Sequence, residues 1–83
     1  MPLFMDVHDH VEGLTAEAVA GAHKRDLEVQ DKYDVNYVQY WFDEGSGKVF
    51  CLVDAPDATA AEAVHREAHG LVADAITPVQ EGA

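Results

Sequence analysis

The fold of this chain follows from one stretch, Val35-Asn36-Tyr37-Val38-Gln39-Tyr40-Trp41-Phe42-Asp43-Glu44-Gly45-Ser46-Gly47-Lys48-Val49-Phe50-Cys51-Leu52-Val53. Residues 35–42 and 48–53 are dense in β-branched and aromatic side chains, which favour extended backbone. Residues 43–47 between them combine glycine with short polar side chains, the composition of a turn. The stretch therefore predicts a β-hairpin with strands over 35–42 and 48–53.

A predicted helix lies on each side of this hairpin. Thr15 is suited to cap a helix over residues 16–32, which has an acid in its first turn and bases toward its end, as the helix dipole prefers. Asp57 is suited to cap a second helix that we expect to run to His69. Gly70 should end that helix, because glycine readily adopts the left-handed conformation found after a helix C-terminus.

The remaining segments predict two outer strands. Residues 2–8 have β character, residues 9–14 read as a loop, and a last short strand lies near 76–80, where Pro78 restricts it to an edge or an end. The order is strand, helix, strand, strand, helix, strand. This order predicts one α+β domain over residues 1–83, a ferredoxin-like βαββαβ sandwich whose antiparallel sheet carries two helices on one face.

The other face of the sheet predicts a homodimer. Strand alternation puts apolar and aromatic side chains on both faces of the long strand, Val35, Tyr37 and Trp41 on one and Val38, Tyr40 and Phe42 on the other. Two helices cover only one face, so we expect the aromatic residues on the other to pack sheet to sheet or against another partner. In the alternative interpretation, the tyrosine hydroxyls of that face simply contact water.

Charge and composition exclude several classes of partner. The 83 residues include sixteen acidic and five basic side chains, a formal net charge of −11, which disfavours nucleic acid and anionic membranes and favours cations. No segment approaches the roughly 20 apolar residues of a membrane helix. Cys51 is the one cysteine, so no intrachain disulfide can form, and we expect a cytoplasmic protein with Cys51 in its core.

Histidine placement makes a metal site the main functional expectation. His65 and His69 are four residues apart on the second predicted helix, where side chains at this spacing are neighbours and can share one ion. In the first strand, Asp6, His8 and His10 follow the two-residue period of one strand face. If Leu3, Met5 and Val7 point to the helices, this row lies on the dimer side, and subunits could share the ions bound there.

The predicted topology brings the histidines to one end of the domain. The first strand ends at His8, and the second helix, which should run in the same direction, ends at His69. Acids of the hairpin and of the 9–14 loop should lie at that end too. We therefore expect an exposed site for a divalent ion, with the candidate ligands His8, His10, His65, His69, Asp6 and Asp9.

Each histidine also has a structural interpretation. His65 and His69 could belong to a solvated helix face, and His65 lies near enough to the apolar stripe to be partly buried. His8 and His10 could form a polar strand end. His23, in the middle of the first helix, could be a half-buried side chain with an ordinary hydrogen-bond partner.

Several stretches resemble a known family of small nickel-binding, ferredoxin-like proteins. They are Met-Asp-Val-His at 5–8, Gly-Leu-Thr-Ala-Glu at 13–17, Ala-His with Asp-Leu at 22–27, Tyr-Trp at 40–41, Val-Phe-Cys-Leu-Val at 49–53 and Val-His-Arg-Glu-Ala-His-Gly at 64–70. The resemblance covers nearly the whole chain. It implies a homodimer, nickel ions bound at the surface and a role in nickel sequestration or detoxification. The stretch Asp9-His10-Val11-Glu12 looks like a local elaboration of the family pattern.

Two functions of different classes remain open. The first is a non-enzymatic nickel-binding protein that uses exposed histidines and carboxylates, with other divalent transition metals able to bind in vitro. The second is a small dimeric α/β-barrel enzyme, monooxygenase-like or isomerase-like, in which His23, His65 or Tyr40 acts as acid or base in a pocket between sheet and helices. An enzyme requires histidines that converge on an enclosed apolar pocket, whereas a metal-sequestering protein requires them on an open acidic surface.

Overall fold

The computed structural model describes residues 2–82 and confirms the predicted order of elements. They are β1 (Leu3–His8), α1 (Ala16–Val29), the 3₁₀ turn η1 (Gln30–Tyr33), β2 (Asn36–Asp43), β3 (Lys48–Asp54), α2 (Ala58–Ala68) and β4 (Ala75–Val79). The first helix was predicted to reach residue 32, but its last turn tightens into η1, which ends where Asp34 adopts a left-handed conformation with φ of 59°.

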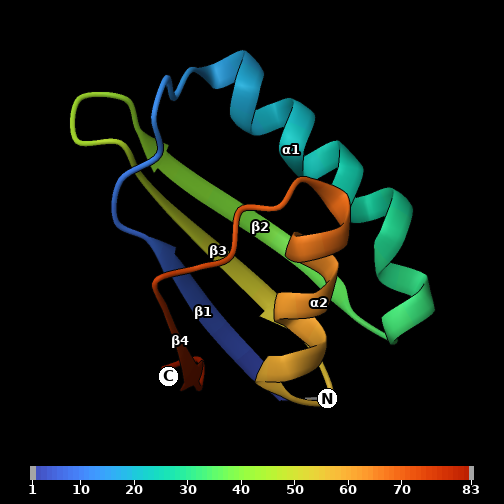
Figure 1. Ribbon diagram of the computed structural model, residues 1–83. Helices are drawn as coiled ribbons and strands as arrows, with labels where there is room; N and C mark the ends of the chain where they lie inside the picture. The colour runs from blue at the N-terminus through green and yellow to red at the C-terminus, as the bar shows by residue number, and fades with distance from the viewer. Residues whose placement is uncertain (1, 83) are drawn as a thin grey trace.

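The four strands form one antiparallel sheet in the order β2-β3-β1-β4. Both helices lie on the same face of this sheet. The α1 helix lies on the β2 side, and α2 lies beside α1 (Figure 1). Pro78 is tolerated because β4 is an edge strand. This is the ferredoxin-like arrangement that the sequence predicts. Among residues 2–82, no helix is long and apolar enough to span a membrane.

The predicted helix caps are present. The Thr15 Oγ1 accepts a hydrogen bond from the Ala18 N–H at 3.1 Å, and the Asp57 carboxylate accepts one from the Ala60 N–H at 2.8 Å. These side chains satisfy N–H groups that have no partner inside the first helical turn. After α2, Gly70 has φ of 80°, the left-handed conformation that favours glycine.

An irregularity in β2 overturns the predicted division of its aromatic residues. Tyr37 pairs with Val53 and Gln39 with Leu52, so the register shifts between Tyr37 and Gln39. This bulge turns Tyr37 and Tyr40 to the same side of the sheet, toward the helices. The prediction that Tyr37 shares a face with Trp41, and not with Tyr40, was wrong because strand alternation ignores an extra residue.

The orientation of β1 is also the reverse of the conditional expectation. Asp6 and His8 alternate with partly buried apolar residues, and both are themselves buried on the helix side of the sheet. Leu3, Met5 and Val7 instead lie on the face that no helix covers. Asp6 and His8 therefore do not lie on the uncovered face of the sheet, and the expectation that ions bound to them are shared through that face is not supported.

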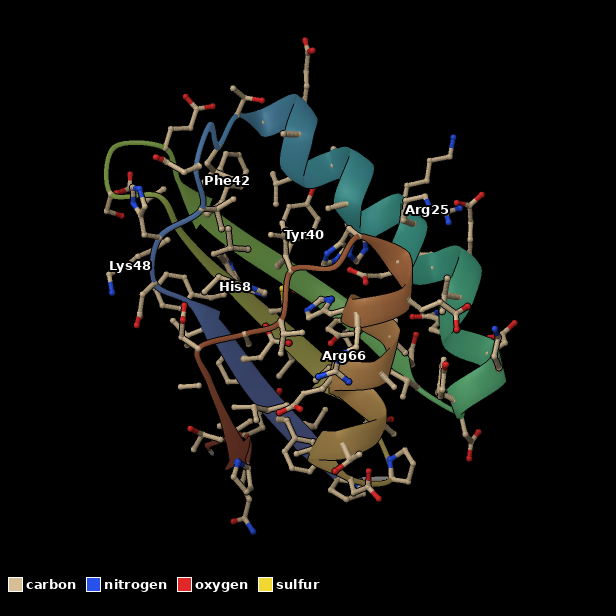
Figure 2. The ribbon with its side chains drawn as sticks, in the orientation of Figure 1. His8, Arg25, Tyr40, Phe42, Lys48 and Arg66 are labelled. Carbon is tan, nitrogen blue, oxygen red and sulfur yellow. The ribbon has the colours of Figure 1, made fainter. Side chains whose placement is uncertain are left out.

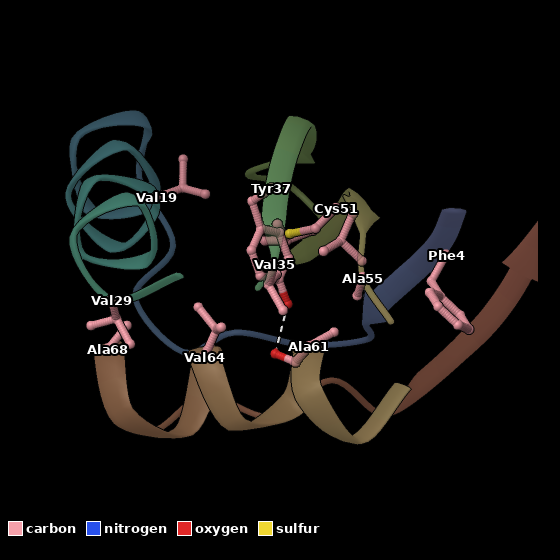
Figure 3. Packing of buried hydrophobic residues seen from close by; sticks show 12 residues of the cluster. Phe4, Val19, Val29, Val35, Tyr37, Cys51, Ala55, Ala61, Val64 and Ala68 are labelled. Carbon is pink, nitrogen blue, oxygen red and sulfur yellow. Dashed lines mark hydrogen bonds between the residues drawn. The ribbon is translucent and has the colours of Figure 1, made fainter. Parts of the chain in front are cut away.

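The core lies between this sheet and the two helices (Figure 3). It is built largely from valine and alanine, with Phe4, Tyr37 and Cys51 as its larger or polarisable members. Val53, Ala61 and Val64 have no exposed surface. Small side chains let α2 approach the sheet closely, so polar side chains placed between the layers are removed from water.

Candidate metal centre

His65 lies at the centre of a buried polar cluster. It lies on the inward-facing side of α2 with Ala61, Val64 and Ala68, and only 2% of its surface is exposed. Its Nδ1 is 2.9 Å from Asp26 Oδ1 on α1, and its Nε2 is 3.0 Å from Asp6 Oδ2 on β1. A ring with a carboxylate at each nitrogen donates twice, which requires the protonated imidazolium.

The carboxylates and His65 stabilise one another's charged forms. Burial alone would lower the pKa of His65, but hydrogen bonds from its ring to Asp26 and Asp6 outweigh burial and raise this pKa to about 9. Burial alone would raise the pKa of Asp6 and of Asp26, but the hydrogen bonds and charge of their histidine partners hold both below the usual range. Two buried carboxylates thus share one imidazolium.

His69 extends the cluster by one turn of α2. The Leu71 N–H donates to His69 Nδ1 at 3.1 Å, so in the neutral ring the proton is on Nε2. That nitrogen is 3.2 Å from Asp26 Oδ1 and 3.1 Å from His65 Nδ1. Asp26 therefore holds both histidines of the four-residue pair, which the helix spacing had placed together.

One oxygen of Asp6 lacks a hydrogen bond. The Tyr37 hydroxyl lies 3.2 Å from Asp6 Oδ2 and 3.0 Å from the Ala61 carbonyl oxygen, which it reaches along the dashed line of Figure 3. Asp6 Oδ1 is buried and makes no hydrogen bond among the described residues, although it lies 3.5 Å from His8 Nε2, close enough for an ion pair when that ring is protonated. Buried polar atoms are nearly always paired, so this oxygen is suited to accept a cation.

Two groups of donor atoms are close enough to hold an ion. Asp6, His8, Cys51 and His65 each offer one atom, and the four atoms lie within 4.8 Å of one another. A second group, Asp26, His65 and His69, has the same closeness. We refer to the union of these groups as the polar cluster. Carboxylate, imidazole and thiol donors together suit borderline divalent ions of the later transition metals.

Binding there requires that protons leave. Burial raises the pKa of the Cys51 thiol, and the nearby Asp6 charge adds to that effect. His65 holds a proton between its two carboxylates. A divalent ion must displace such protons to use the thiol or that ring as ligands, whereas Asp6 Oδ1, an ionised oxygen without a hydrogen bond, has no proton to lose.

Comparison with known proteins shows to which family the chain belongs. A sequence profile for the family described as "Nickel responsive protein SCO4226-like" matches residues 4–79. The chain belongs to this SCO4226-like family. The crystal structure of SCO4226 from Streptomyces coelicolor A3(2) matches with a TM-score of 0.90 and 40% sequence identity, covering 98% of this chain and 99% of that chain. No protein with a curated description matches the chain.

In this SCO4226-like chain, only some of the predicted ligands come together. Asp6, His8, His65 and His69 join the polar cluster, but the first three are buried, contrary to the expectation of an exposed site. The β1 strand ends at His8, so the predicted row of alternating ligands does not continue to His10. The prediction that the end of β1 meets α2 is confirmed, because His8 lies beside His65. The prediction that these side chains are exposed is wrong, because both are buried.

The other two predicted ligands lie with the hairpin turn. His10 Nδ1 is 3.3 Å from the Ser46 carbonyl oxygen, and His10 Nε2 is 3.4 Å from Glu12 Oε2. Asp9 Oδ1 lies 3.6 Å from Lys48 Nζ. We refer to Asp9, His10, Glu12, Glu44 and Ser46 as the hairpin end. Within residues 2–82, no group of three close metal donors forms there.

The hairpin acids have structural partners. Asp43 accepts hydrogen bonds from the Ser46 backbone and hydroxyl, which closes the turn. Glu44 Oε1 accepts from the Ala16 N–H at 2.9 Å and so caps the positive end of α1. The two hairpin acids, which were expected to lie near the histidines as oxygen donors, therefore hold the turn and the start of α1.

Sequence reasoning missed Asp26, Cys51 and Tyr37 as members of the site. Asp26 stands in the inward stripe of α1 between Val19 and Val29, and an acid in such a stripe signals a buried partner. Cys51 was assigned to the core, which is correct, but its closeness to Asp6 could not be read from spacing. That contact depends on the pairing of β1 with β3.

A pocket of about 160 Å³ opens beside the polar cluster. His8, Asp26, His65 and His69 line its floor, while apolar side chains of the 11–14 loop and of α1 line much of its wall. His8 of β1 and Tyr40 of β2 both lie on the helix side of the sheet (Figure 2). Four of the five histidines, His8, His23, His65 and His69, thus line this pocket, whereas His10 does not.

Proposed function

We propose that this protein binds nickel(II) and withholds it from other ligands, a role in nickel sequestration or detoxification. The observation that carries the proposal is the group of Asp6, His8, Cys51 and His65, whose donor atoms lie within 4.8 Å and include Asp6 Oδ1, a buried oxygen without a hydrogen bond. The nickel-responsive description of the family supports nickel among the ions that such donors accept. The proposed role is binding, without catalysis.

Each ligand has a proposed part. Asp6 Oδ1 and His8 Nε2, which face each other 3.5 Å apart, are the first contacts of the ion. Cys51 and His65 complete the set as their protons leave. His69 is a secondary ligand, whereas Asp9 and His10 lie at the hairpin end and are not expected to bind this ion. Affinity should fall as the pH falls, because neutral imidazole is the ligand; at His65, whose pKa is raised to about 9, protons compete with the ion already below that pH.

The test is a calorimetric nickel titration of the tag-free protein at pH 7.5, with His8→Ala and His10→Ala as a matched pair. Each substitution removes one histidine, His8 from the polar cluster and His10 from the hairpin end. We expect micromolar or tighter binding that weakens at least tenfold in His8→Ala and stays within about twofold in His10→Ala. The binding free energies of the two variants should then differ by at least about 1 kcal/mol. Circular dichroism of each variant checks that the fold is kept.

A binding heat no larger than that expected for weak, non-specific binding of nickel to surface carboxylates would overturn the nickel proposal. Loss of binding in His10→Ala alone would move the site to the hairpin end. Copper should bind at least as tightly in vitro, because affinity rises from nickel to copper for a given set of ligands. Copper that bound much more weakly than nickel would point to a geometry that the polar cluster does not offer.

The proposal includes a homodimer in the cytoplasm. The uncovered sheet face carries Trp41, which is 45% exposed, beside the partly buried apolar side chains of β1 and β3. Packing this face against a second copy would remove it from water. The cytoplasmic location is supported by a single free cysteine and no disulfide.

Sedimentation equilibrium of Trp41→Ser tests the dimer. Leu27→Ser is the matched control, since Leu27 of α1 is also 45% exposed but lies on the helix layer. We expect Trp41→Ser to weaken the dimer at least tenfold and Leu27→Ser to leave it unchanged. Equal effects, or a monomeric parent protein, would contradict assembly through the sheet.

One observation favours the enzyme alternative. Its histidines were expected to converge on a largely apolar pocket, and His8, His23, His65 and His69 do line one. The Asp6–His65–Asp26 hydrogen bonds would orient an acid or base. A catalytic role also requires that an organic molecule enter this pocket, so binding of such a molecule is the first condition that this alternative must meet.

A further inference from the structure

The pocket has the dimensions of one small ring. Its volume is about 160 Å³. An engineered apolar cavity of roughly 150 Å³ is large enough to bind benzene, so a single six-membered ring fits this space. Its wall is mostly apolar and includes Leu14, Val19, Ala22 and Val49 from three different segments. A ring placed there would contact the loop, the helix and the sheet together.

Two polar side chains on the wall are free to contact a ligand. His23 of α1 and Tyr40 of β2 face each other with ring centroids 4.7 Å apart. Within residues 2–82, neither the His23 ring nor the Tyr40 hydroxyl hydrogen-bonds to another residue. Each can donate or accept a hydrogen bond, and both rings present an aromatic surface. They suit a ligand that carries both a ring and a hydroxyl.

The charge around the pocket selects against anions. Asp26 lines the floor and Asp6 lies just behind it, with His65 as the imidazolium that they share. The whole chain carries a formal net charge of −11. A carboxylate or phosphate in the pocket would add a negative charge to this surrounding, whereas an uncharged hydroxyl would not.

We propose that the pocket between α1 and the sheet binds a small uncharged aromatic molecule with one hydroxyl, of the phenol class. The ring occupies the apolar wall beside Ala22, and the hydroxyl bonds to Tyr40 or His23. The inference does not rest on nickel binding, because the pocket and its free polar groups exist without an ion. It supplies the ligand class that the enzyme alternative lacks.

The test uses the full chain, freed of metal with a chelator, and follows amide shifts by nuclear magnetic resonance during titration with phenol. We expect saturable shifts around the pocket with a Kd at or below about 1 mM. Toluene, which has a similar size but no hydroxyl, should bind at least fivefold more weakly than phenol. Benzoate, an anion, should bind at least tenfold more weakly. No saturable shift at tens of millimolar phenol would overturn the proposal, and toluene as tight as phenol would overturn the ligand class.

Two variants of α1 separate filling of the pocket from damage to the helix. Ala22→Leu places a larger side chain in the pocket, and Ala20→Leu makes the same change at an exposed position that does not line it. Phenol binding should weaken at least tenfold in Ala22→Leu and remain unchanged in Ala20→Leu. Tyr40→Phe should weaken phenol about fivefold and leave toluene unaffected. Equal effects of the two leucine variants would contradict binding in this pocket.

Discussion

The polar cluster and the hairpin end contain the same kinds of side chain in opposite surroundings. In the polar cluster, His65 is 2% exposed and bonds to two carboxylates, whereas the His10 side chain at the hairpin end is 68% exposed beside Glu12. Removal from water makes every charge and hydrogen bond of the first region costly to leave unpaired. Water screens the second region, so its ion pairs contribute little to stability.

The largest expected difference between the two regions concerns stability. His65→Ala leaves the carboxylates of Asp6 and Asp26 buried without their shared cation, which should lower the free energy of unfolding by about 3–5 kcal/mol. His10→Ala at the exposed hairpin end should change it by no more than about 0.5 kcal/mol. Urea unfolding of metal-free protein measures both. Similar losses in the two variants would contradict the distinction between buried and exposed histidines.

The second prediction concerns the pH dependence of stability. The pKa of His65 is raised from 6.5 to about 9 by folding, so its contribution is complete below about pH 6.5 and is lost as the pH rises through 9. The free energy of unfolding of the metal-free protein should fall over that interval by up to about 3 kcal/mol, at 1.36 kcal/mol per pKa unit. Asp6 and Asp26 have lowered pKa values, so their contributions are lost as the pH falls below about 4.

Urea unfolding at a series of pH values measures this dependence. His10→Ala should retain the decline above pH 6.5, because its ring lies outside the polar cluster. His65→Gln should abolish it, since glutamine carries no titrating group. A flat profile between pH 6.5 and 9 in the parent protein would show that His65 is not held as an imidazolium.

The third prediction uses nickel as a stabilising ligand. At a free nickel concentration of about 100 times the Kd, binding to the folded state alone should add about 2.7 kcal/mol to the free energy of unfolding. His8→Ala should lose most of this increment and His10→Ala should keep it. Thermal unfolding with and without nickel makes the measurement, and the reverse result would assign the ion to the hairpin end.

The smallest effect is expected at the hairpin end. Glu44→Ala removes the carboxylate that accepts the Ala16 N–H at the start of α1, which should lower the free energy of unfolding by up to about 1 kcal/mol. Glu12→Ala, an exposed acid of the same end that caps no helix, is the control and should have no measurable effect. Neither substitution should change nickel affinity. A loss of affinity in Glu44→Ala would show that this acid is a ligand.

The elements of the fold could be read from the sequence because their signals are local. Thr15 and Asp57 marked helix starts, Gly70 marked a helix end, and Pro78 marked an edge strand, each through the conformation or hydrogen bond of a single residue. The meeting of His8 with His65 followed from the order of strands and helices. The family resemblance was confirmed over residues 4–79.

Side-chain direction was the part that local patterns could not supply. Strand alternation gives two faces but does not say which face meets the helices, so Asp6 and His8 were expected to be exposed and are buried. The bulge between Tyr37 and Gln39 leaves no clear mark in the residue pattern. The partnership of Asp26 with His65 joins residues 39 positions apart, a distance at which spacing carries no information.

The sequence by itself determined the ferredoxin-like order, the helix caps, the acidic charge and the supply of histidines, because propensity, capping and composition act within a few residues. Only the tertiary structure decided that Asp6, His8, Cys51 and His65 share one buried position beside a pocket, while His10 remains with the hairpin turn. The physical reason is burial. Whether a histidine is a solvated side chain or an imidazolium between two carboxylates depends on which layers close over it, and that is set by packing between elements distant in the chain.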